Sequence, residues 1–389
     1  MNGFNKKTQK AVFEKFTELF HYEPLMLVSP GRINLIGEHT DYNEGFVLPA
    51  AIDKYMFFAI GKNNSQKIKL FAADLNEYAE FEIDNIQKSK VHWANFIIGM
   101  VYQFQKEGFD IEGFDCVFGS TIPVGAGLSS SAALECGIGF GLSEIFNIEI
   151  DKMKLAFMAQ KAEHDFAGLK CGIMDQFATL FGKQNNAMKL DCSTLEYKYI
   201  SSNFTEFQFV LCDSKVKHSL ASTEYNKRRE ECELGVEIYK QFQPETKTLR
   251  NINLDVLHKN KSAFPEIIFN RCKFVCEENE RVIEACKALE NMEFIQLGEL
   301  LYRSHYGLQH DYEVSCKELD FLVDTAKMSG YVLGARMMGG GFGGCTINLL
   351  RKENTEKFIS IVKEKFLQQF HYEPECYVAN ISDGTKILN

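Results

Sequence analysis

The sequence predicts an α+β protein of about two domains, and three observations support this prediction. The chain has 389 residues, more than a single hydrophobic core usually holds. Short β-like and helical segments alternate as far as residue 214, whereas helical segments dominate residues 223–330. With 45% hydrophobic and 25% charged residues, the composition is that of a packed globular protein.

The N-terminal half opens with a predicted helix and continues with a largely antiparallel sheet. Residues 8–20 place Val12, Phe16 and Leu19 at helical spacing, with Thr8 as the expected N-cap. Four short strands bounded by Asn, Gly or Asp follow, at 25–28, 55–60, 67–73 and 78–83. We then expect a helix over 91–107 closed by Gly108, a strand within 113–123, helices over 128–146 and 152–166, and strands in 186–191, 197–201 and 207–214.

The C-terminal half begins with helices and ends with an alternation of strand and helix. Residues 223–242 and most of 264–330 read as helices. A glycine-rich turn at 339–344 precedes a strand at 345–350, a helix at 353–369 and a last strand at 375–382. We place the domain boundary between residues 205 and 206, which gives domains 1–205 and 206–389, although no Pro/Ser-rich linker marks it.

Charge and cysteine usage restrict the classes of partner and compartment. The net charge of −10 opposes nonspecific binding to nucleic acid or to anionic lipid. The N-terminus lacks the apolar region of a secretion signal, and no apolar run is long enough to span a membrane, so we expect a cytoplasmic protein. The twelve cysteines are expected to be reduced and mostly buried, and the spacing of Cys272 and Cys276 does not predict a zinc site.

Two segments are candidates for ligand binding. PGRINLIGEHTDY (30–42) carries an Arg, a Glu, a His and an Asp, which considered alone could also form a solvated loop. PVGAGLSSSAALE (123–135) joins a predicted strand to a predicted helix through two glycines and three serines. Free backbone N–H groups and the helix dipole make such a junction an anion-binding site, although a simple helix-capping turn is the alternative.

Two further segments carry carboxylates and glycines in unusual settings. In KAEHDFAGLKCGIMDQF (161–177), Glu163 lies near the end of a helix and Asp175 lies in a turn among apolar residues. A carboxylate there needs a partner, and Arg32 is the obvious one, whereas a helix N-cap is the alternative role for Asp175. GARMMGGGFGGC (334–345) has five glycines within six residues, which indicates close approach of its main chain to a ligand or to the other domain, or else a flexible hairpin.

Together the four segments resemble the galactokinase branch of the GHMP family of small-molecule kinases, over essentially the whole chain. PGRINLIGEHTDYNEGFVLP resembles the branch's signature, GAGLSSSAALE its phosphate loop, AEHDFAGLKCGIMDQF its catalytic segment and GARMMGGGFGGC its third motif. One departure is Met338, where the family usually carries Thr. The resemblance implies an N-terminal domain like domain 2 of ribosomal protein S5, a C-terminal ferredoxin-like domain, and a monomer.

The resemblance also implies an activity. Members of the branch transfer the γ-phosphoryl group of ATP, with Mg²⁺, to the anomeric hydroxyl of galactose, which is the first phosphorylation step of galactose catabolism. Asp175 would be the catalytic base, and Arg32 would stabilise its charge and that of the moving phosphoryl group. Ser131 and Glu163 would hold Mg²⁺, with Ser130 as an alternative ligand.

The remaining expected site residues also come from the resemblance. The ATP phosphates would contact Gly125, Ala126, Gly127, Leu128, Ser129, Ser130 and Ser131. The sugar would contact Glu38, His39, Thr40, Asp41, Gly172 and Tyr225. His39 could instead be a structural hydrogen-bonding residue, and Trp93 could stack on adenine or lie in the core.

Two other functions stay open at this stage. One is a related sugar 1-kinase that acts on N-acetylgalactosamine or L-arabinose. The other is a galactose-sensing regulator that binds ATP and sugar with little catalysis. The intact SSSAA run (129–133) and Asp175 argue against the regulator, because such sensors can lack part of this segment.

Overall fold

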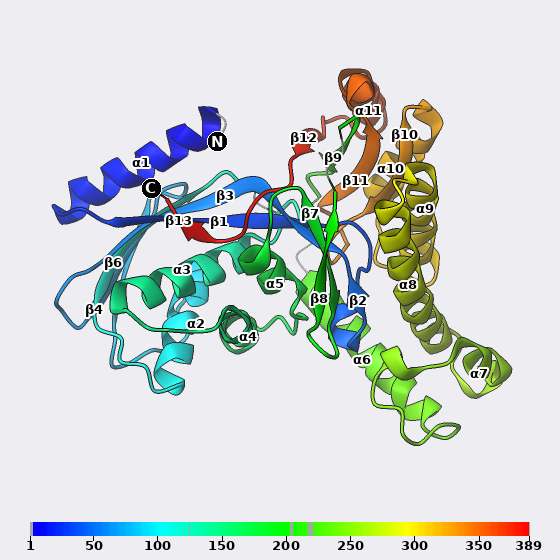
Figure 1. Cartoon of the computed structure of the whole chain (residues 1–389), viewed down its shortest axis with the longest axis horizontal. Coiled ribbons are helices and arrows are strands. Elements are labelled where there is room, and N and C mark those ends of the chain that lie inside the picture. Colours follow the sequence, from blue (N-terminus) through cyan, green and yellow to red (C-terminus); the bar gives the residue numbers. More distant parts are fainter. Residues whose placement is uncertain (1–2, 124, 203–204, 217–220, 389) are drawn as a thin grey trace.

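The computed structural model describes residues 3–123, 125–202, 205–216 and 221–388. It has two halves side by side, each built on its own antiparallel or mostly antiparallel sheet (Figure 1). Among the described residues, no helix is both long and apolar enough to cross a membrane.

The sheet of the N-terminal half has six strands in the order β13-β1-β3-β6-β4-β5. Every neighbouring pair is antiparallel except β4 and β6, which confirms the predicted sheet. The strands are β1 (Leu25–Asn34), β3 (Pro49–Lys62), β4 (Lys67–Ala72), β5 (Glu77–Glu82), β6 (Phe114–Ser120) and β13 (Lys386–Ile387). A second, three-stranded sheet contains β2 (Phe46–Val47), β7 (Asn186–Asp191) and β8 (Tyr197–Ser201).

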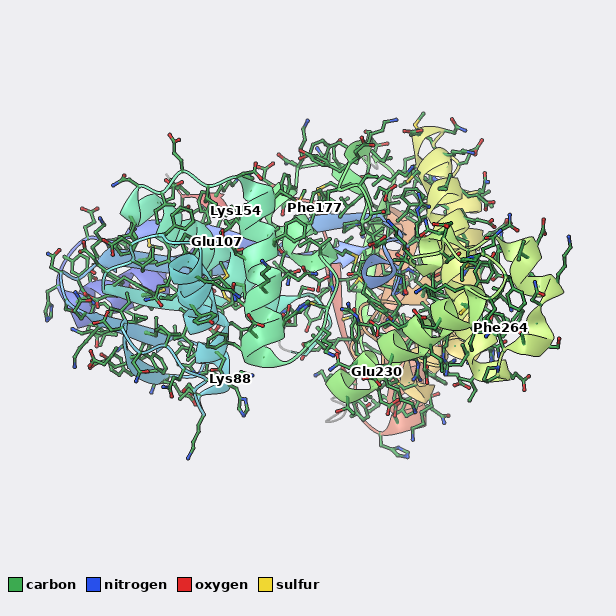
Figure 2. All side chains as sticks on the ribbon, turned by 90° about the horizontal axis from the view of Figure 1, so that it is seen from below. Lys88, Glu107, Lys154, Phe177, Glu230 and Phe264 are labelled. Carbon is green, nitrogen blue, oxygen red and sulfur yellow. The ribbon has the colours of Figure 1, made fainter. Side chains whose placement is uncertain are left out.

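Helices cover both faces of the six-stranded sheet (Figure 1). On one face lies α1 (Gly3–Phe20), which buries Val12 and Phe16 against Val28 and Phe57. On the other lie α2 (His92–Lys106), α3 (Ser130–Phe146), α4 (Lys152–Ala162), the π-helical turn η2 (Glu163–Ala167) and α5 (Met174–Phe181). Figure 2 shows Lys154 of α4 near Glu107 at the end of α2, where their Nζ and Oε2 atoms are 2.9 Å apart.

The C-terminal half has a four-stranded antiparallel sheet in the order β10-β11-β9-β12. Its strands are β9 (Phe207–Asp213), β10 (Val332–Met337), β11 (Cys345–Arg351) and β12 (Glu375–Ala379). Its helices are α6 (Ala221–Tyr239), α7 (Leu254–Lys259), α8 (Glu266–Glu290), α9 (Phe294–His310), α10 (Lys317–Ser329) and α11 (Thr355–Phe370). Short 3₁₀ turns complete the chain: η1 (Asp41–Asn43), η3 (Leu249–Asn251), η4 (Lys261–Ala263) and η5 (Lys352–Asn354).

Two local predictions were wrong, and one strand was not predicted. The first helix begins at Gly3, so Thr8 lies inside it and is not the N-cap. Asp175 lies in the first turn of α5 rather than in a connecting turn, and the N-cap position belongs to Ile173. Residues 332–337 form strand β10, which the glycine content of the following segment obscured in the sequence.

The two halves share packing as well as a covalent link. The chain leaves the N-terminal sheets after β8 and enters the C-terminal sheet at β9, on either side of the proposed boundary at 205/206. After β12 it returns, and β13 pairs with β1 of the N-terminal sheet. One hydrophobic cluster contains Ile33 and Leu48 of the first half together with Val282 and Ile347 of the second. The twelve cysteines are free, and nine of them are buried.

Helix α9 lies unusually close to β10, the strand that leads into the glycine-rich segment. A Cβ atom placed on Gly298 of α9 would come within 2.2 Å of the carbonyl oxygen of Leu333, and one on Gly334 would come within 2.3 Å of Gly298. Backbone atoms cannot move aside as a flexible side chain can, so both positions require glycine.

We predict that Gly298→Ala lowers the free energy of unfolding by about 1–3 kcal/mol, because the added methyl group separates α9 from β10. Chemical denaturation measures this change. The matched control is Glu299→Ala, which removes an exposed side chain from the adjacent position of the same helix and should change stability by less than about 0.5 kcal/mol. Equal stability of Gly298→Ala and the native protein would contradict the prediction.

Candidate active site

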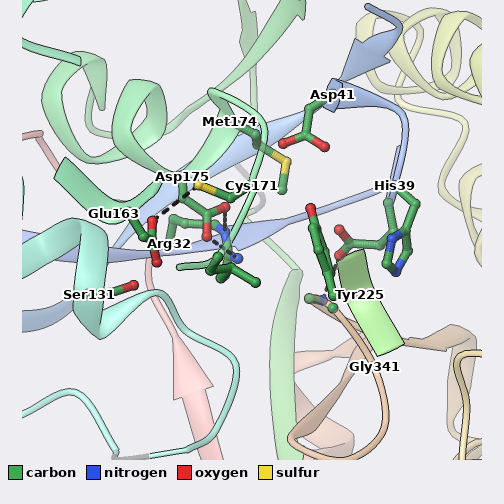
Figure 3. Close-up of a pocket in the computed structure, with 14 residues that line it drawn as sticks. Arg32, His39, Asp41, Ser131, Glu163, Cys171, Met174, Asp175, Tyr225 and Gly341 are labelled. Carbon is green, nitrogen blue, oxygen red and sulfur yellow. Dashed lines mark hydrogen bonds and ion pairs between the residues drawn. The ribbon is translucent and has the colours of Figure 1, made fainter. Parts of the chain in front are cut away.

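A cavity of about 260 Å³ brings together residues from all four sequence motifs (Figure 3). Its walls include Arg32, Glu38, His39 and Asp41 from the first motif, Ser131 from the second, Glu163 and Asp175 from the third, Gly339, Gly340 and Gly341 from the fourth, and Tyr225 from α6. Residues more than 300 positions apart therefore meet at one site.

Arg32 and Asp175 form a two-pronged ion pair at the floor of this cavity. Arg32 Nε donates to Asp175 Oδ1 at 2.7 Å, and Nη2 donates to Oδ2 at 2.8 Å. Arg32 is buried, whereas the Asp175 side chain keeps 25% of its surface exposed towards the cavity. The pairing that the sequence suggested is confirmed, and its planar geometry is the strongest form of such a contact.

Arg32 also fastens the phosphate loop to this pair. Its Nη1 donates to the carbonyl oxygen of Gly127 at 2.7 Å, and its backbone N–H donates to Leu128. Ser129 Oγ donates to Asp175 Oδ2 in a short hydrogen bond. The loop, the base candidate and the guanidinium are thus held as one unit.

The N-terminus of α3 has features that favour the binding of an anion. Ser129 occupies the N-cap position in the left-handed region (φ 58°), and its hydroxyl makes no capping bond because it points to Asp175. Gly125 and Gly127 adopt φ values of 80° and 72°, which explains why glycine stands there. Uncapped N–H groups and the helix dipole suit phosphate oxygens.

Glu163 presents a buried carboxylate beside Ser131. It accepts from Cys171 Sγ at 3.2 Å and from Gln176 Nε2 at 2.8 Å, with the Ser131 hydroxyl also within reach. Burial, and then the charge of Asp175, raise the pKa of Glu163 to about 7, although these hydrogen bonds oppose the shift. A hydroxyl and an under-neutralised carboxylate on one wall fit a hard divalent cation.

Asp41 forms the opposite wall, near Met174 (Figure 3). Its Oδ1 accepts from the backbone N–H of Tyr42 at 2.9 Å. Burial, and then the charges of Asp175 and Glu38, raise the pKa of Asp41 to about 7. A Cβ atom on Gly172 would come within 2.1 Å of Asp41 Oδ2, so any larger residue at position 172 would collide with this carboxylate.

His39 is neutral and fixed by aromatic neighbours. Burial, and then the charge of Arg228, lower its pKa to about 3. Its Nδ1 lies 2.9 Å from the hydroxyl of Tyr42, and its ring packs 5.2 Å from that of Tyr225. His39 therefore lines the cavity and is at the same time part of a buried hydrogen-bonded group, so both roles proposed from the sequence remain.

The glycine-rich segment approaches the phosphate loop through its backbone. A Cβ atom on Gly339 would lie 3.3 Å from the carbonyl oxygen of Gly127, and one on Gly344 would lie 3.4 Å from Ala126. A Cβ atom on Gly341 would come within 2.1 Å of the carbonyl oxygen of Val314, in the C-terminal half itself. The close approach to the opposite half is confirmed, while Met338 is buried in the hydrophobic core.

Sequence reasoning missed the cavity-lining residues Leu169, Cys171 and Met174, and it missed Arg336, which contacts the lining residue Glu38 from behind the cavity wall. This fully buried guanidinium, from β10, contacts Glu38 Oε1 at 3.1 Å through Nη1. Its position inside the motif 334–345, just before the run of glycines at 339–344, was a usable signal, because an arginine between apolar residues in a buried strand needs an acidic partner.

Some expected residues lie away from this cavity. Thr40 is fully buried, and its hydroxyl donates to the carbonyl oxygens of Gly37 and Phe46, so this hydroxyl supports the loop, and the expected contact of Thr40 with the sugar stays a prediction. Trp93 Nε1 donates to Glu77 at 2.6 Å, and its ring packs against Phe118. The expected adenine contact of Trp93 stays a prediction, as do the phosphate contacts of residues 125–130.

Comparison with family models gives matches in three segments. A galactokinase galactose-binding signature matches residues 14–62, the GHMP kinase N-terminal domain matches residues 95–183, and the GHMP kinase C-terminal domain matches residues 275–368. A galactokinase of Clostridium acetobutylicum is 39% identical over 97% of this chain and 98% of its own length. The chain belongs to the galactokinase family. A second member, from Thermosipho africanus, is 41% identical over 92% of this chain and 99% of its own.

Solved structures agree with this membership. A crystal structure of Lactococcus lactis galactokinase complexed with galactose superposes with a TM-score of 0.94 at 34% identity, covering the whole of both chains. Mevalonate kinase of Methanococcus jannaschii, at 18% identity, superposes with a TM-score of 0.65 over 92% of this chain and 99% of its own, which shows the fold alone. The α+β fold class and the two GHMP kinase domains are confirmed.

The raised pKa values of Asp41 and Glu163 predict a stability that falls with pH. Unfolding returns these groups to ordinary values of 3.8 and 4.5, so between about pH 4 and pH 7 the folded protein binds more protons than the unfolded chain. The cost of the two charges is absent at low pH and complete above about pH 7. The melting temperature (Tm) of the ligand-free protein should therefore fall as the pH rises through this range.

Asp41→Asn and Glu163→Gln should each raise that Tm at about pH 8, by about 2 °C or more, and change it little at about pH 4. Thermal unfolding at both pH values measures the effect. Asp84→Asn, at an exposed position, is the matched control. Its Tm should change between the two pH values by the same amount as that of the native protein. A lower Tm for both site variants at the higher pH would refute the account.

Proposed function

We propose that this chain transfers the γ-phosphoryl group of ATP to the anomeric hydroxyl of α-D-galactose, giving galactose 1-phosphate and ADP. One observation carries the proposal: the residues of the galactose-binding signature converge with Asp175, Arg32 and the phosphate loop on one cavity. The full-length similarity to galactokinases, including one crystallised with galactose, supports it. The proposed place in metabolism is the first phosphorylation step of galactose catabolism.

In the proposed reaction, Asp175 receives the proton of the sugar's 1-hydroxyl. The resulting oxygen forms a bond to the γ-phosphorus while the bond from that phosphorus to the oxygen it shares with the β-phosphorus breaks, so ADP leaves with the electron pair. Three donors on Asp175 (Arg32 Nε and Nη2, and Ser129 Oγ) fix both of its oxygens in place. Arg32 also lies where it can counter the negative charge of the transition state.

The phosphates would lie along Gly125, Ala126, Gly127, Leu128, Ser129, Ser130 and Ser131, where the uncapped N-terminus of α3 supplies donors. We propose that Ser131 and Glu163 hold Mg²⁺, which would neutralise phosphate charge when bound. Among the described residues, no group of three or more His, Cys, Asp or Glu side chains could hold a metal alone, so phosphate oxygens and water would complete its ligands.

The polar groups around the cavity suit a sugar. Glu38 and Asp41 offer acceptors, His39 offers a neutral ring nitrogen and Tyr225 a hydroxyl. Gly172, which lies against Asp41, could present its N–H. Buried acceptors left without a hydroxyl are costly, which would distinguish an axial from an equatorial 4-hydroxyl. Free, mostly buried cysteines support a cytoplasmic location, and we propose a monomer on family precedent.

A coupled ADP-release assay with ATP and Mg²⁺ over a panel of sugars tests the proposal, with N-acetylgalactosamine, L-arabinose and glucose beside galactose. We expect galactose to have the highest kcat/KM and nuclear magnetic resonance to place the phosphate on C1. Binding of galactose without turnover of any sugar would favour a sensor. Preference for N-acetylgalactosamine or L-arabinose would keep the kinase and replace its substrate.

Asp175→Asn should lower kcat by about 10²–10⁴-fold with little change in galactose affinity, because the amide keeps the shape of the carboxylate but cannot accept the proton. Steady-state kinetics and galactose titration measure the two quantities. Asp165→Asn, an exposed position in the neighbouring π-helical turn, is the control. A kcat within threefold of the native value would remove Asp175 from the chemistry.

A further inference from the structure

The galactose signature is held in place by the other half of the protein. Arg336 of β10 is fully buried, and its guanidinium reaches four partners. Nε donates to the carbonyl oxygen of Leu35 at 2.8 Å, Nη1 donates to Met337 O at 2.6 Å, and Nη2 donates to Asn34 O. Nη1 and Nη2 also lie 3.1 and 3.2 Å from Glu38 Oε1. The planar guanidinium of Arg336 thus holds both the backbone that precedes Glu38 and the carboxylate of Glu38.

These contacts divide the two oxygens of Glu38 between protein and cavity. Oε1 accepts from Arg336 and also from the backbone N–H of Gly339 at 2.8 Å. Within the described part of the chain, no protein donor contacts Oε2, although Glu38 lines the cavity. Oε1 is therefore occupied by donors of the C-terminal half, and Oε2 can accept a hydrogen bond from a ligand hydroxyl.

A second buried carboxylate of the C-terminal half accepts a hydrogen bond from Gly37, the residue before Glu38. Glu278 of α8 is fully buried, and its Oε1 accepts from the backbone N–H of Gly37 at 2.9 Å and from Ser304 Oγ at 2.7 Å. Its Oε2 accepts from Arg281 Nε at 2.6 Å. Gly37 has φ +102°, so this sharp bend is stabilised from the C-terminal half.

We propose that Arg336 and Glu278 are positioning residues of the sugar site. They hold Gly37 and Glu38 so that, of the two carboxylate oxygens of Glu38, only Oε2 faces the galactose hydroxyls. This proposal rests on the proposed function and deepens it, because it makes sugar recognition depend on docking of the two halves. Neither residue lines the cavity, and both act through Glu38. On the ATP side, among the residues that the structure describes, Arg336 and Glu278 make no hydrogen bond to Arg32 or to the phosphate loop, which the C-terminal half approaches through the backbone of Gly339 and Gly344.

The test is Arg336→Lys, which keeps the charge but loses the planar fork needed to reach Asn34, Leu35 and Glu38 together. The matched control is Arg271→Lys. Arg271 is also buried in the C-terminal half and also holds carboxylates, Glu231 and Glu313, but it does not contact the signature. Both variants replace a buried guanidinium with an ammonium group, so a difference between their galactose KM values reports on the sugar site rather than on stability.

We expect Arg336→Lys to raise the galactose KM about tenfold or more and to leave the ATP KM within about twofold. The increase of Tm caused by galactose should shrink, while the increase caused by a non-hydrolysable ATP analogue should remain. Arg271→Lys should lower the Tm of the free protein yet keep the galactose KM within about twofold.

A folded Arg336→Lys protein with native galactose KM would overturn the proposal, as would equal rises of the galactose and ATP KM values. If Arg336→Lys does not fold, Glu278→Gln decides: a rise of about threefold or more in galactose KM alone supports the proposal, and an unchanged KM refutes it. Failure of the native protein to phosphorylate galactose would instead refute the proposed function, which separates the two outcomes.

Discussion

The ion pair between Arg32 and Asp175 is the constraint on which the candidate site depends. One buried guanidinium contacts the carboxylate on both oxygens and the carbonyl oxygen of Gly127 in the phosphate loop. It therefore sets the position of the proposed base relative to the phosphates. The strand β1, the loop after β6 and the helix α5 are far apart in sequence, and this single side chain joins all three.

The cavity has an excess of negative charge that its ligands would relieve. Asp41 and Glu163 both have pKa values raised to about 7, and burial, followed by the charge of Glu163, also raises the pKa of Glu135 well above its ordinary value. Arg32 and Arg336 are already engaged by Asp175 and Glu38. A cation beside Glu163 and a sugar beside Asp41 would supply the missing partners, so the same residues that destabilise the free protein would provide binding energy to the complex.

Much of the site could be predicted from the sequence because its motifs are local. The glycine and serine content of 125–131 and the pairing of Arg32 with Asp175 follow from residue chemistry, and the structure confirms the pair. Contacts between residues far apart in the sequence were harder to predict. Arg336 contacts Glu38 across 298 positions, and no periodic pattern in the sequence indicates such a contact. The resemblance implies a sugar contact for Thr40, but it does not show that the Thr40 hydroxyl donates to the backbone of Gly37 and Phe46. Helix starts and the short strand β10 were missed because local propensity is weaker than tertiary packing.

A double-mutant cycle on Arg32 and Asp175 tests most directly whether the two residues act as one unit. The measured quantity is kcat for Arg32→Lys, Asp175→Asn and the double variant, each confirmed as folded. Our account predicts that the double variant loses no more than about tenfold beyond the worse single variant, because either change dismantles the same arrangement. Losses that multiply fully would contradict it, since they would mean that Arg32 and Asp175 contribute to the reaction independently.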